Sequence, residues 1–275
     1  MLAASIIVLR ESFEAALLIG IIAAATRSIA QRGRWIVAGI LAGLAGACAV
    51  AALTERIAGL FEGAGQELFN VLVLGIAVVL LGWHNVWMSG HGAELAAGAR
   101  RVGQEIDDGR RSLSAILTLI ALAVLREGSE SVLFLYGLMS SGDATMLSIA
   151  TGATLGLLMG VALGVVLYAG MLRIPMRWFF SVTSALILLI AAGMASRIAQ
   201  FLIQADLLPS LASPLWDLSP LLPTDSVPGG VLRALIGYDA APAGMQVLFY
   251  AATALAILTG MWFAKSRQPS PAAAG

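Results

Sequence analysis

The sequence has little charge, one cysteine and two histidines. Only 12% of its 275 residues are charged, 59% are hydrophobic, and the mean hydropathy is +0.91. Soluble domains average roughly 25% charged residues, so the deficit predicts a chain that lies mainly in lipid. The 16 basic and 16 acidic side chains balance to a net charge of 0, which gives no indication of a nucleic-acid partner. Cys48 alone excludes an internal disulfide, and His84 and His91 are too few for a histidine-built metal site.

Two further features are missing. The N-terminus lacks a basic region, and Arg10, Glu11 and Glu14 interrupt the apolar segment that a cleavable signal peptide needs. We therefore expect Met1 to belong to the mature chain. No G-x-x-x-x-G-K-[ST] motif for ATP phosphates is present, so transport would depend on gradients or on oxidation outside the cell.

Seven segments are apolar over the length of about 20 residues that a membrane-spanning helix requires. They cover 2–25, 35–53, 68–87, 113–139, 146–171, 178–199 and 245–264. By the positive-inside rule, their flanking charges predict an N-terminus outside and a C-terminus in the cytoplasm of an inner (cytoplasmic) membrane. Three basic residues follow the even-numbered segments, and eleven follow the odd-numbered ones: Arg27, Arg32, Arg34, Arg100, Arg101, Arg110, Arg111, Arg173, Arg177, Lys265 and Arg267.

The connections differ in composition. Residues 91–112 mix charge with apolar positions and predict a cytoplasmic linker that contains an amphipathic helix. Residues 201–244 hold six of the nine prolines together with large apolar side chains, which predicts a folded external loop. Residues 266–275 are mainly small and polar and predict a disordered cytoplasmic tail.

An internal repeat divides the chain. Residues 8–14 read VLRESFE and residues 124–130 read VLREGSE, and each motif opens a block of three spans, at about 1–90 and 113–200. Blocks of three spans insert with opposite orientation, which is typical of the inverted repeats of transporters. The predicted fold is therefore an all-α integral membrane protein with an inverted 3+3 repeat and a seventh helix outside it. The middle span of each block carries glycines suited to close helix packing: Gly39, Gly43 and Gly46 in the first, and Gly152, Gly156, Gly160 and Gly164 in the second.

The two motifs place charges near the centre of their spans, where each charge costs about 2.5–3.5 kcal/mol. Positions i, i+3 and i+4 share one helix face, so the charges of a motif can face each other, a water-filled path or a ligand. Two arginines and four glutamates leave a formal charge of −2, which favours a proton or a bound cation, and carboxylate oxygens suit hard cations. Motif 1 consists of Arg10, Glu11 and Glu14, and motif 2 of Arg126, Glu127 and Glu130. Two simpler readings remain open: intrahelical ion pairs that only fix packing, and a proton relay without metal.

These motifs, on the first and fourth of seven predicted helices, resemble the oxidase-dependent iron transporters, the family of the fungal high-affinity iron permeases and the bacterial EfeU-type permeases. The resemblance covers nearly the whole chain and extends to FEGAGQELF at 61–69 and to LWDLS and LIGYDAAP in the external loop. It implies iron import, with iron as ferric ion after oxidation outside, and no permanently bound cofactor. It assigns metal binding to Glu11, Glu14, Glu127 and Glu130, and charge balance and orientation to Arg10 and Arg126.

The resemblance also implies periplasmic partners that oxidise or deliver iron. The external loops lack the short acidic ExxE motif of the fungal branch, so a partner protein would capture the ion at the surface. Three other residues are candidates of lesser weight. Glu62 and Glu67, at the predicted outer mouth of the third span, would attract cations there, although a solvated helix start explains them better. His84 would serve as an exit ligand, although an interfacial polar residue at the cytoplasmic end of that span explains it better.

Three alternatives to iron import remain at this point. The same carboxylates suit another divalent cargo, manganese or lead, because ligand type does not separate these ions. A membrane di-iron oxidase would use carboxylates too, but its helices pair glutamate with histidine, and neither motif has a histidine. In a structural or signalling membrane protein, the motifs would only pack.

Overall fold

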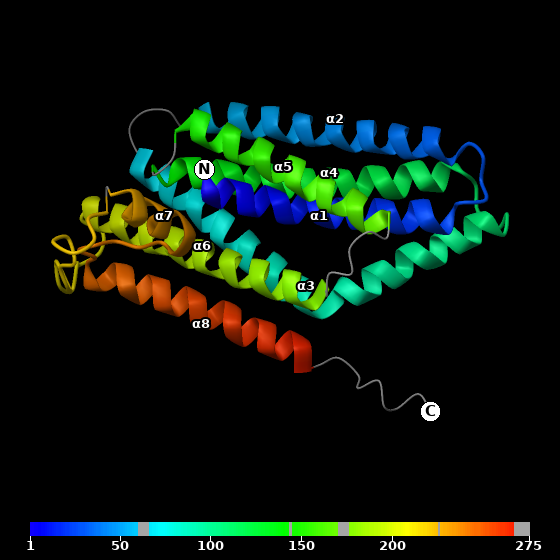
Figure 1. Cartoon of the computed structure of the whole chain (residues 1–275). Coiled ribbons are helices and arrows are strands. Elements are labelled where there is room, and N and C mark those ends of the chain that lie inside the picture. The colour runs from blue at the N-terminus through cyan, green and yellow to red at the C-terminus, as the bar shows by residue number, and fades with distance from the viewer. Residues whose placement is uncertain (60–65, 143–144, 170–175, 225, 267–275) are drawn as a thin grey trace. The chain divides into compact units, whose positions relative to one another are not determined.

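The structure is a computed structural model that describes residues 1–59, 66–142, 145–169, 176–224 and 226–266. Within these ranges the chain forms eight helices and no strand (Figure 1). Seven helices are long, and one, α7, has 10 residues. The helices are α1 (Leu2–Ala25), α2 (Arg32–Gly59), α3 (Gln66–Asp107), α4 (Ser114–Ser140), α5 (Met146–Tyr168), α6 (Met176–Gln204), α7 (Val227–Ile236) and α8 (Gly244–Ser266).

Five of the long helices have the length and composition to cross a membrane, which makes this a multi-pass membrane protein. The apolar stretches are Arg32–Arg56, Leu68–Met88, Met146–Tyr168, Phe180–Gln204 and Gly244–Ala264, on α2, α3, α5, α6 and α8. The remaining two, α1 and α4, have 24 and 27 residues and are long enough. They differ from the five because each carries the three charges of a motif near its middle. Composition alone therefore marks five spans, and the sixth and seventh stay a prediction.

The helix bounds agree with the predicted spans within a few residues at most ends, and α3 is the main exception. The apolar stretch ends near Met88, as predicted, and the helix continues to Asp107, so the helix predicted within 91–112 follows the span without a break. Beyond the last helical residue, Gly109 has a φ of +73°, and the amide of Arg110 donates to the carbonyl of Glu105 at 2.8 Å. This is the bonding that closes a helix with a left-handed glycine.

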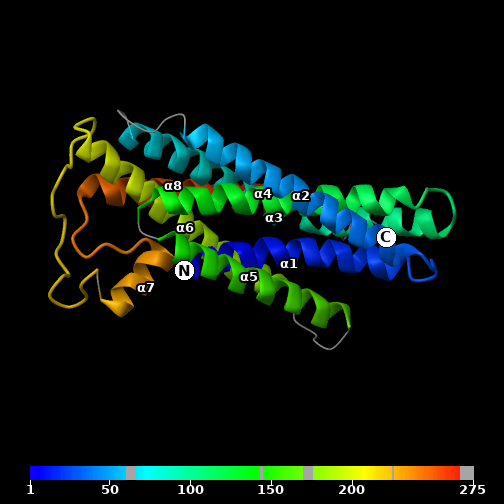
Figure 2. The ribbon, with the colours of Figure 1, turned by 90° about the horizontal axis from the view of Figure 1, so that it is seen from above.

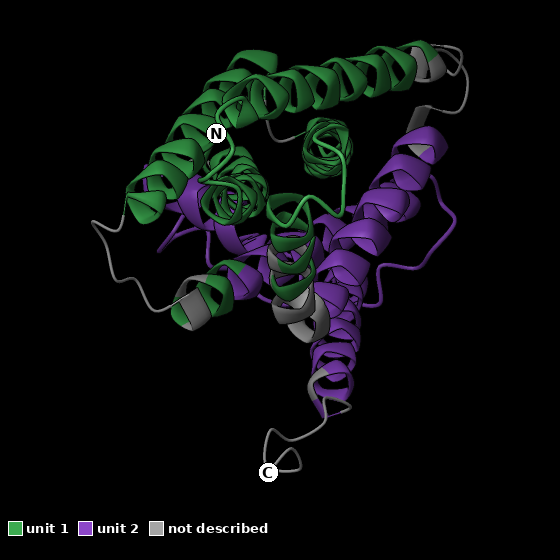
Figure 3. Ribbon diagram, turned by 90° about the vertical axis from the view of Figure 1, so that its right-hand side faces the viewer, with its two compact units in different colours: residues 1–66, 94–183 green, residues 67–93, 184–275 purple. Residues whose placement is uncertain are grey.

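The chain divides into two compact units, coloured separately in Figure 3. Unit 1 comprises residues 1–66 and 94–183, and thus α1, α2, α4, α5 and the second part of α3. Unit 2 comprises residues 67–93 and 184–275, and thus the first part of α3, most of α6, and α7 and α8. The two units together contain the predicted repeats, but the boundary between the units cuts through α3 and α6.

In unit 1 the second helix of each predicted block packs against the first helix of the other block. Helix α2 packs along α4, helix α5 packs along α1, and α1 also contacts α4. A Cβ on Gly43 would lie 2.7 Å from the carbonyl oxygen of Ala121, and one on Gly156 would lie 2.9 Å from the amide nitrogen of Leu9. The predicted glycine faces therefore bring backbones into close approach, as small residues do between membrane helices.

The helices of unit 1 run in two directions. In both Figure 1 and Figure 2, α1 and α5 run one way, whereas α2 and α4 run the opposite way. Each closely packed pair is therefore parallel. The two motif helices, α1 and α4, are antiparallel to each other.

The second part of α3 belongs to unit 1 and packs at one end of it. Ile106 of α3, Ile22 of α1 and Ile116 of α4 form one buried apolar cluster, with exposures of 4%, 3% and 0%. Gly103 lies directly against Ala25, and the Ser28 hydroxyl donates to the Asp107 carboxylate. This packing explains why the helix continues beyond the apolar stretch.

Unit 2 joins α3, α6 and α8. The side-chain amide of Asn85 on α3 donates to the backbone carbonyl of Ser184 on α6 at 2.9 Å. A Cβ on Gly260 of α8 would lie 2.8 Å from Cγ2 of Val86 on α3. Contacts with both neighbours thus position the part of α3 around residues 85 and 86.

The segment between α6 and α8 is folded. Helix α7 begins at Ser226, whose hydroxyl accepts from the amide of Gly229 at 3.1 Å, and ends at Gly237 with a φ of +69°. Gly237 lies against Gly193 of α6, where a Cβ on Gly193 would be 2.7 Å from the Gly237 Cα. The Tyr238 hydroxyl donates to the carbonyl of Leu222 at 2.9 Å. These contacts hold the segment in one conformation.

Candidate metal site

Both motifs lie on antiparallel helices of unit 1, and motif 1 is fully enclosed. Arg10 and Glu11 are 0% exposed, and Glu14 is 5% exposed. Glu127 of motif 2 is also 5% exposed. Enclosed charges of this kind are stable only when they are paired or coordinate an ion.

The ion pairs within the two motifs have the same geometry. Arg10 Nε lies 3.0 Å from Glu14 Oε1, and its Nη1 lies 3.8 Å from Glu11 Oε1. In motif 2, Arg126 Nε lies 3.0 Å from Glu130 Oε1 and 3.8 Å from Glu127 Oε1. Each arginine therefore binds the i+4 glutamate closely and the i+1 glutamate loosely.

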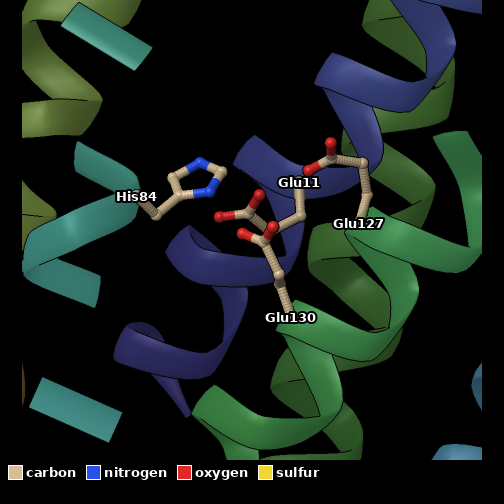
Figure 4. A group of neighbouring side chains, drawn as sticks. All are labelled: Glu11, His84, Glu127 and Glu130. Atoms are coloured by element: carbon tan, nitrogen blue, oxygen red, sulfur yellow. The ribbon is translucent and has the colours of Figure 1, made fainter. Parts of the chain in front are cut away.

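Three of the four motif glutamates converge. One carboxylate oxygen from each of Glu11, Glu127 and Glu130 lies within 4.8 Å of the others. Figure 4 shows these carboxyl groups turned toward one another, Glu11 from α1 and the other two from α4. At this separation the negative charges of these carboxylates repel one another. A shared proton or a bound multivalent cation would relieve this repulsion.

The two motifs differ in exposure. The side chains of Arg126 and Glu130 are 38% and 23% exposed, whereas those of Arg10 and Glu14 are 1% and 6% exposed. Glu14 is not one of the three converging glutamates. The prediction treated the two motifs as equivalent, but the structure makes motif 2 the more accessible one.

The residues between the motif charges serve local packing. The hydroxyl of Ser12 donates to the carbonyl of Val8, and the hydroxyl of Ser129 donates to that of Leu125, both at 2.5 Å. A Cβ on Gly128 would lie 2.7 Å from the Cβ of Ala47 on α2. Glycine at that position permits the close approach of α2 to α4, which the sequence did not reveal.

The structure describes only part of the candidates of lesser weight. Glu62 falls outside the described residues, and Glu67 is in α3 but its side chain is also outside the description. His84, which Figure 4 also draws, belongs to unit 2 and is 3% exposed. It lies close to the end of the apolar stretch at Met88, as predicted for a residue near the end of the span, and α3 continues beyond it to Asp107. Its role as an exit ligand stays a prediction.

Buried, paired carboxylates on two antiparallel helices of a multi-pass membrane protein are typical of membrane transporters for cations. Residues 1–267 match the Iron permease FTR1 family, and the chain belongs to that family. It is thus an iron permease and not an enzyme.

Curated relatives support the same assignment. The chain is 34% identical over 247 residues to the ferrous iron permease EfeU of Escherichia coli O6:H1, covering 88% of each chain. It is 33% identical to the protein of that name from Shigella sonnei, again over 88% of each chain. The Yersinia pestis protein of that name is 30% identical over 89% of this chain and 87% of its own. No solved structure matches the chain.

Proposed function

We propose that this chain imports iron through a carboxylate site in the middle of the membrane, formed by motif 1 and motif 2. In this site Glu11, Glu127 and Glu130 bind the ion together, and Glu14 exchanges with them as the ion passes. Arg10 and Arg126 orient the carboxylates and balance their charge. The convergence of the three carboxylates within 4.8 Å is the observation on which this proposal rests.

The charge of the site suits a small, highly charged ion. Four glutamates and two arginines sum to a formal charge of −2, so a ferrous ion would neutralise the site and a ferric ion would leave a charge of +1. The resemblance to oxidase-dependent transporters favours ferric ion after oxidation outside, whereas the bacterial relatives are named ferrous iron permeases. The cargo is therefore the first quantity to measure.

The transport path follows from the architecture. We infer seven membrane spans, with α1 and α4 as the two that carry charge, and an inverted repeat of α1–α3 and α4–α6 with α8 outside it. The antiparallel course of α1 and α4, and the exchanged pairs α1 with α5 and α4 with α2, are what a two-fold relation between the blocks requires. The site would then lie on the axis between the blocks.

We further propose that the protein lies in the cytoplasmic membrane with its N-terminus outside and its C-terminus inside. Periplasmic proteins that oxidise or deliver iron would then meet the folded segment between α6 and α8. A C-terminal fusion to green fluorescent protein should fluoresce, and a fusion to alkaline phosphatase should be inactive. The reverse result would invert the orientation and with it the direction of the path.

The central test is uptake of radiolabelled iron into proteoliposomes, with ferrous and ferric ion offered separately and manganese, lead and zinc as competitors. We expect Glu11→Gln, Glu14→Gln and Glu130→Gln to reduce initial uptake at least tenfold. Glu105→Gln is the matched control, because Glu105 pairs with Arg111 at 2.7 Å outside both motifs. Uptake that persists in all three motif variants would leave the motifs with a packing role. Stronger competition by manganese or lead than by unlabelled iron would change the cargo.

A further inference from the structure

One polar side chain in unit 2 stands apart from both motifs. Asn85 lies on α3 within the apolar stretch Leu68–Met88 and is 0% exposed. The same stretch buries one other polar side chain, His84 at 3% exposure, and its remaining buried residues are apolar, such as Leu74 and Leu81, both 0% exposed. A carboxamide at this depth needs a partner for its nitrogen and another for its oxygen.

The nitrogen has its partner, and this fixes the orientation of the group. Asn85 Nδ2 donates to the carbonyl oxygen of Ser184 at 2.9 Å. Because an amide is planar, Oδ1 must point away from that carbonyl. A rotation that exchanged the two atoms would place two oxygens against each other.

The oxygen is buried and accepts no hydrogen bond from any residue that the structure describes. Leaving such a group without a partner costs about 1–3 kcal/mol by protein mutational data. An apolar residue of similar size would avoid this cost and would still pack between α3 and α6. Asn85 therefore reduces stability at this position in exchange for a free acceptor, which is typical of a functional site in a membrane interior.

A carboxamide oxygen has a definite ligand chemistry. It is neutral and hard, carries the negative end of the amide dipole, and binds cations or their water molecules. It cannot donate a proton to an anion. As a neutral ligand it holds a cation more weakly than a carboxylate, which suits a position where the ion must also leave.

We propose that Asn85 is a transit ligand of the iron path, with Oδ1 taking up the ion or its hydration water on the way to the cytoplasm. This inference rests on the proposed import function and names a neutral oxygen ligand within unit 2. In the proposed orientation Asn85 lies toward the cytoplasmic end of the apolar stretch, three residues before Met88. The ligand of Asn85 would be a hard multivalent cation, which is ferrous or ferric ion in this protein.

The test compares three variants in the proteoliposome assay. Asn85→Leu removes the oxygen and the donor, Asn85→Asp keeps an oxygen but loses the donor, and Ser184→Ala leaves the backbone acceptor unchanged. We expect Asn85→Leu to lower the maximal uptake rate at least tenfold, with KM changed less than threefold and a melting temperature equal to or above wild type. Asn85→Asp should retain uptake and shift the ratio of iron to manganese transport, whereas Ser184→Ala should match wild type in both.

The outcomes separate the possible explanations. Equal loss of uptake and of melting temperature in Asn85→Leu and Asn85→Asp would assign Asn85 to the α3–α6 bridge and overturn the inference. Wild-type kinetics and selectivity in both variants would overturn it as well. In either case the import function would stand as long as uptake by the wild type depends on the motif glutamates. No uptake by the wild type would refute the proposed function itself.

Discussion

Replacing Gly156 with alanine should push α5 away from α1, the helix that carries Glu11 and Glu14. A Cβ at this position would meet the carbonyl oxygen of Ser5 and lie 2.9 Å from the amide nitrogen of Leu9. Both are backbone atoms of α1, which cannot rotate away as a side chain can. The contact is relieved only if one of the two helices moves.

The magnitude follows from two opposing terms. Alanine in place of a helical glycine stabilises by about 1 kcal/mol, because glycine has the larger conformational entropy to lose. Overpacking of a close contact costs about 1–3 kcal/mol. Gly75 on α3 supplies the control, since a Cβ there would meet nothing within 4 Å and only the stabilising term applies. The two variants should therefore differ by about 1–3 kcal/mol, with Gly156→Ala the less stable.

Unfolding in detergent, followed by circular dichroism, would give the order of stability, and iron uptake would report on the site. We expect Gly75→Ala to equal or exceed the wild type in stability and to match it in uptake. Gly156→Ala should lose uptake because Glu11 moves with α1. Gly43→Ala should behave in the same way, because its Cβ would lie 2.7 Å from the Ala121 carbonyl on α4, the other motif helix. Equal stability and equal uptake of Gly156→Ala and Gly75→Ala would refute the close packing of α1 and α5.

Three further predictions concern charge, capping and pH. Breaking a buried ion pair costs about 3–5 kcal/mol, so Arg10→Gln should lower the melting temperature more than Arg126→Gln, because their side chains are 1% and 38% exposed. Equal losses would contradict the difference in burial between the motifs. Ser226→Ala removes the cap of α7 and should cost about 1 kcal/mol locally, seen as faster amide exchange at Gly229 with uptake unchanged; unchanged exchange there would disprove the cap. Hydrogen bonds from Ser219 lower the pKa of the Asp217 carboxyl. These bonds therefore stabilise the folded chain fully above the unfolded pKa of about 3.9. Their contribution is lost as the pH falls through the lower pKa of the folded state. At neutral pH the Ser219 amide should therefore exchange more slowly in the wild type than in Asp217→Asn. In acid the two exchange rates should become equal, and a difference that persists there would argue against this assignment.

Sequence patterns predicted the presence of the helices better than the residues at which they begin and end. The predicted segment 2–25 matches α1, Leu2–Ala25, because apolar composition and helix coincide there. For α3 the end of the apolar stretch near Met88 was predicted, but its unbroken continuation to Asp107 was not, because the backbone remains helical where tertiary contacts support it. Ile106 provides such a contact in the cluster with Ile22 and Ile116. Helix α7 was not predicted either, because six prolines dominate the composition of its segment.

The candidate site was likewise predicted only in part from the sequence. The spacing of Arg10 and Glu14 predicted a shared helix face, and both motifs have the i, i+4 ion pair at 3.0 Å. Asn85 did not emerge from the sequence, because one asparagine in an apolar stretch resembles a packing residue. Its significance lies in the Ser184 carbonyl on another helix and in an oxygen that lacks a donor.

The sequence by itself determined that the chain lies mainly in lipid, where most helices lie along it, and how the charges pair within each motif. These properties depend on composition and on residues within one or two helical turns. Only the tertiary structure decided that α2 packs on α4 and α5 on α1, that Glu11 meets Glu127 and Glu130, and that motif 2 is the more exposed. Such contacts join residues more than a hundred positions apart in α1 and α4. Helical periodicity predicts which face of a helix is buried, but it carries no information about which helix covers that face.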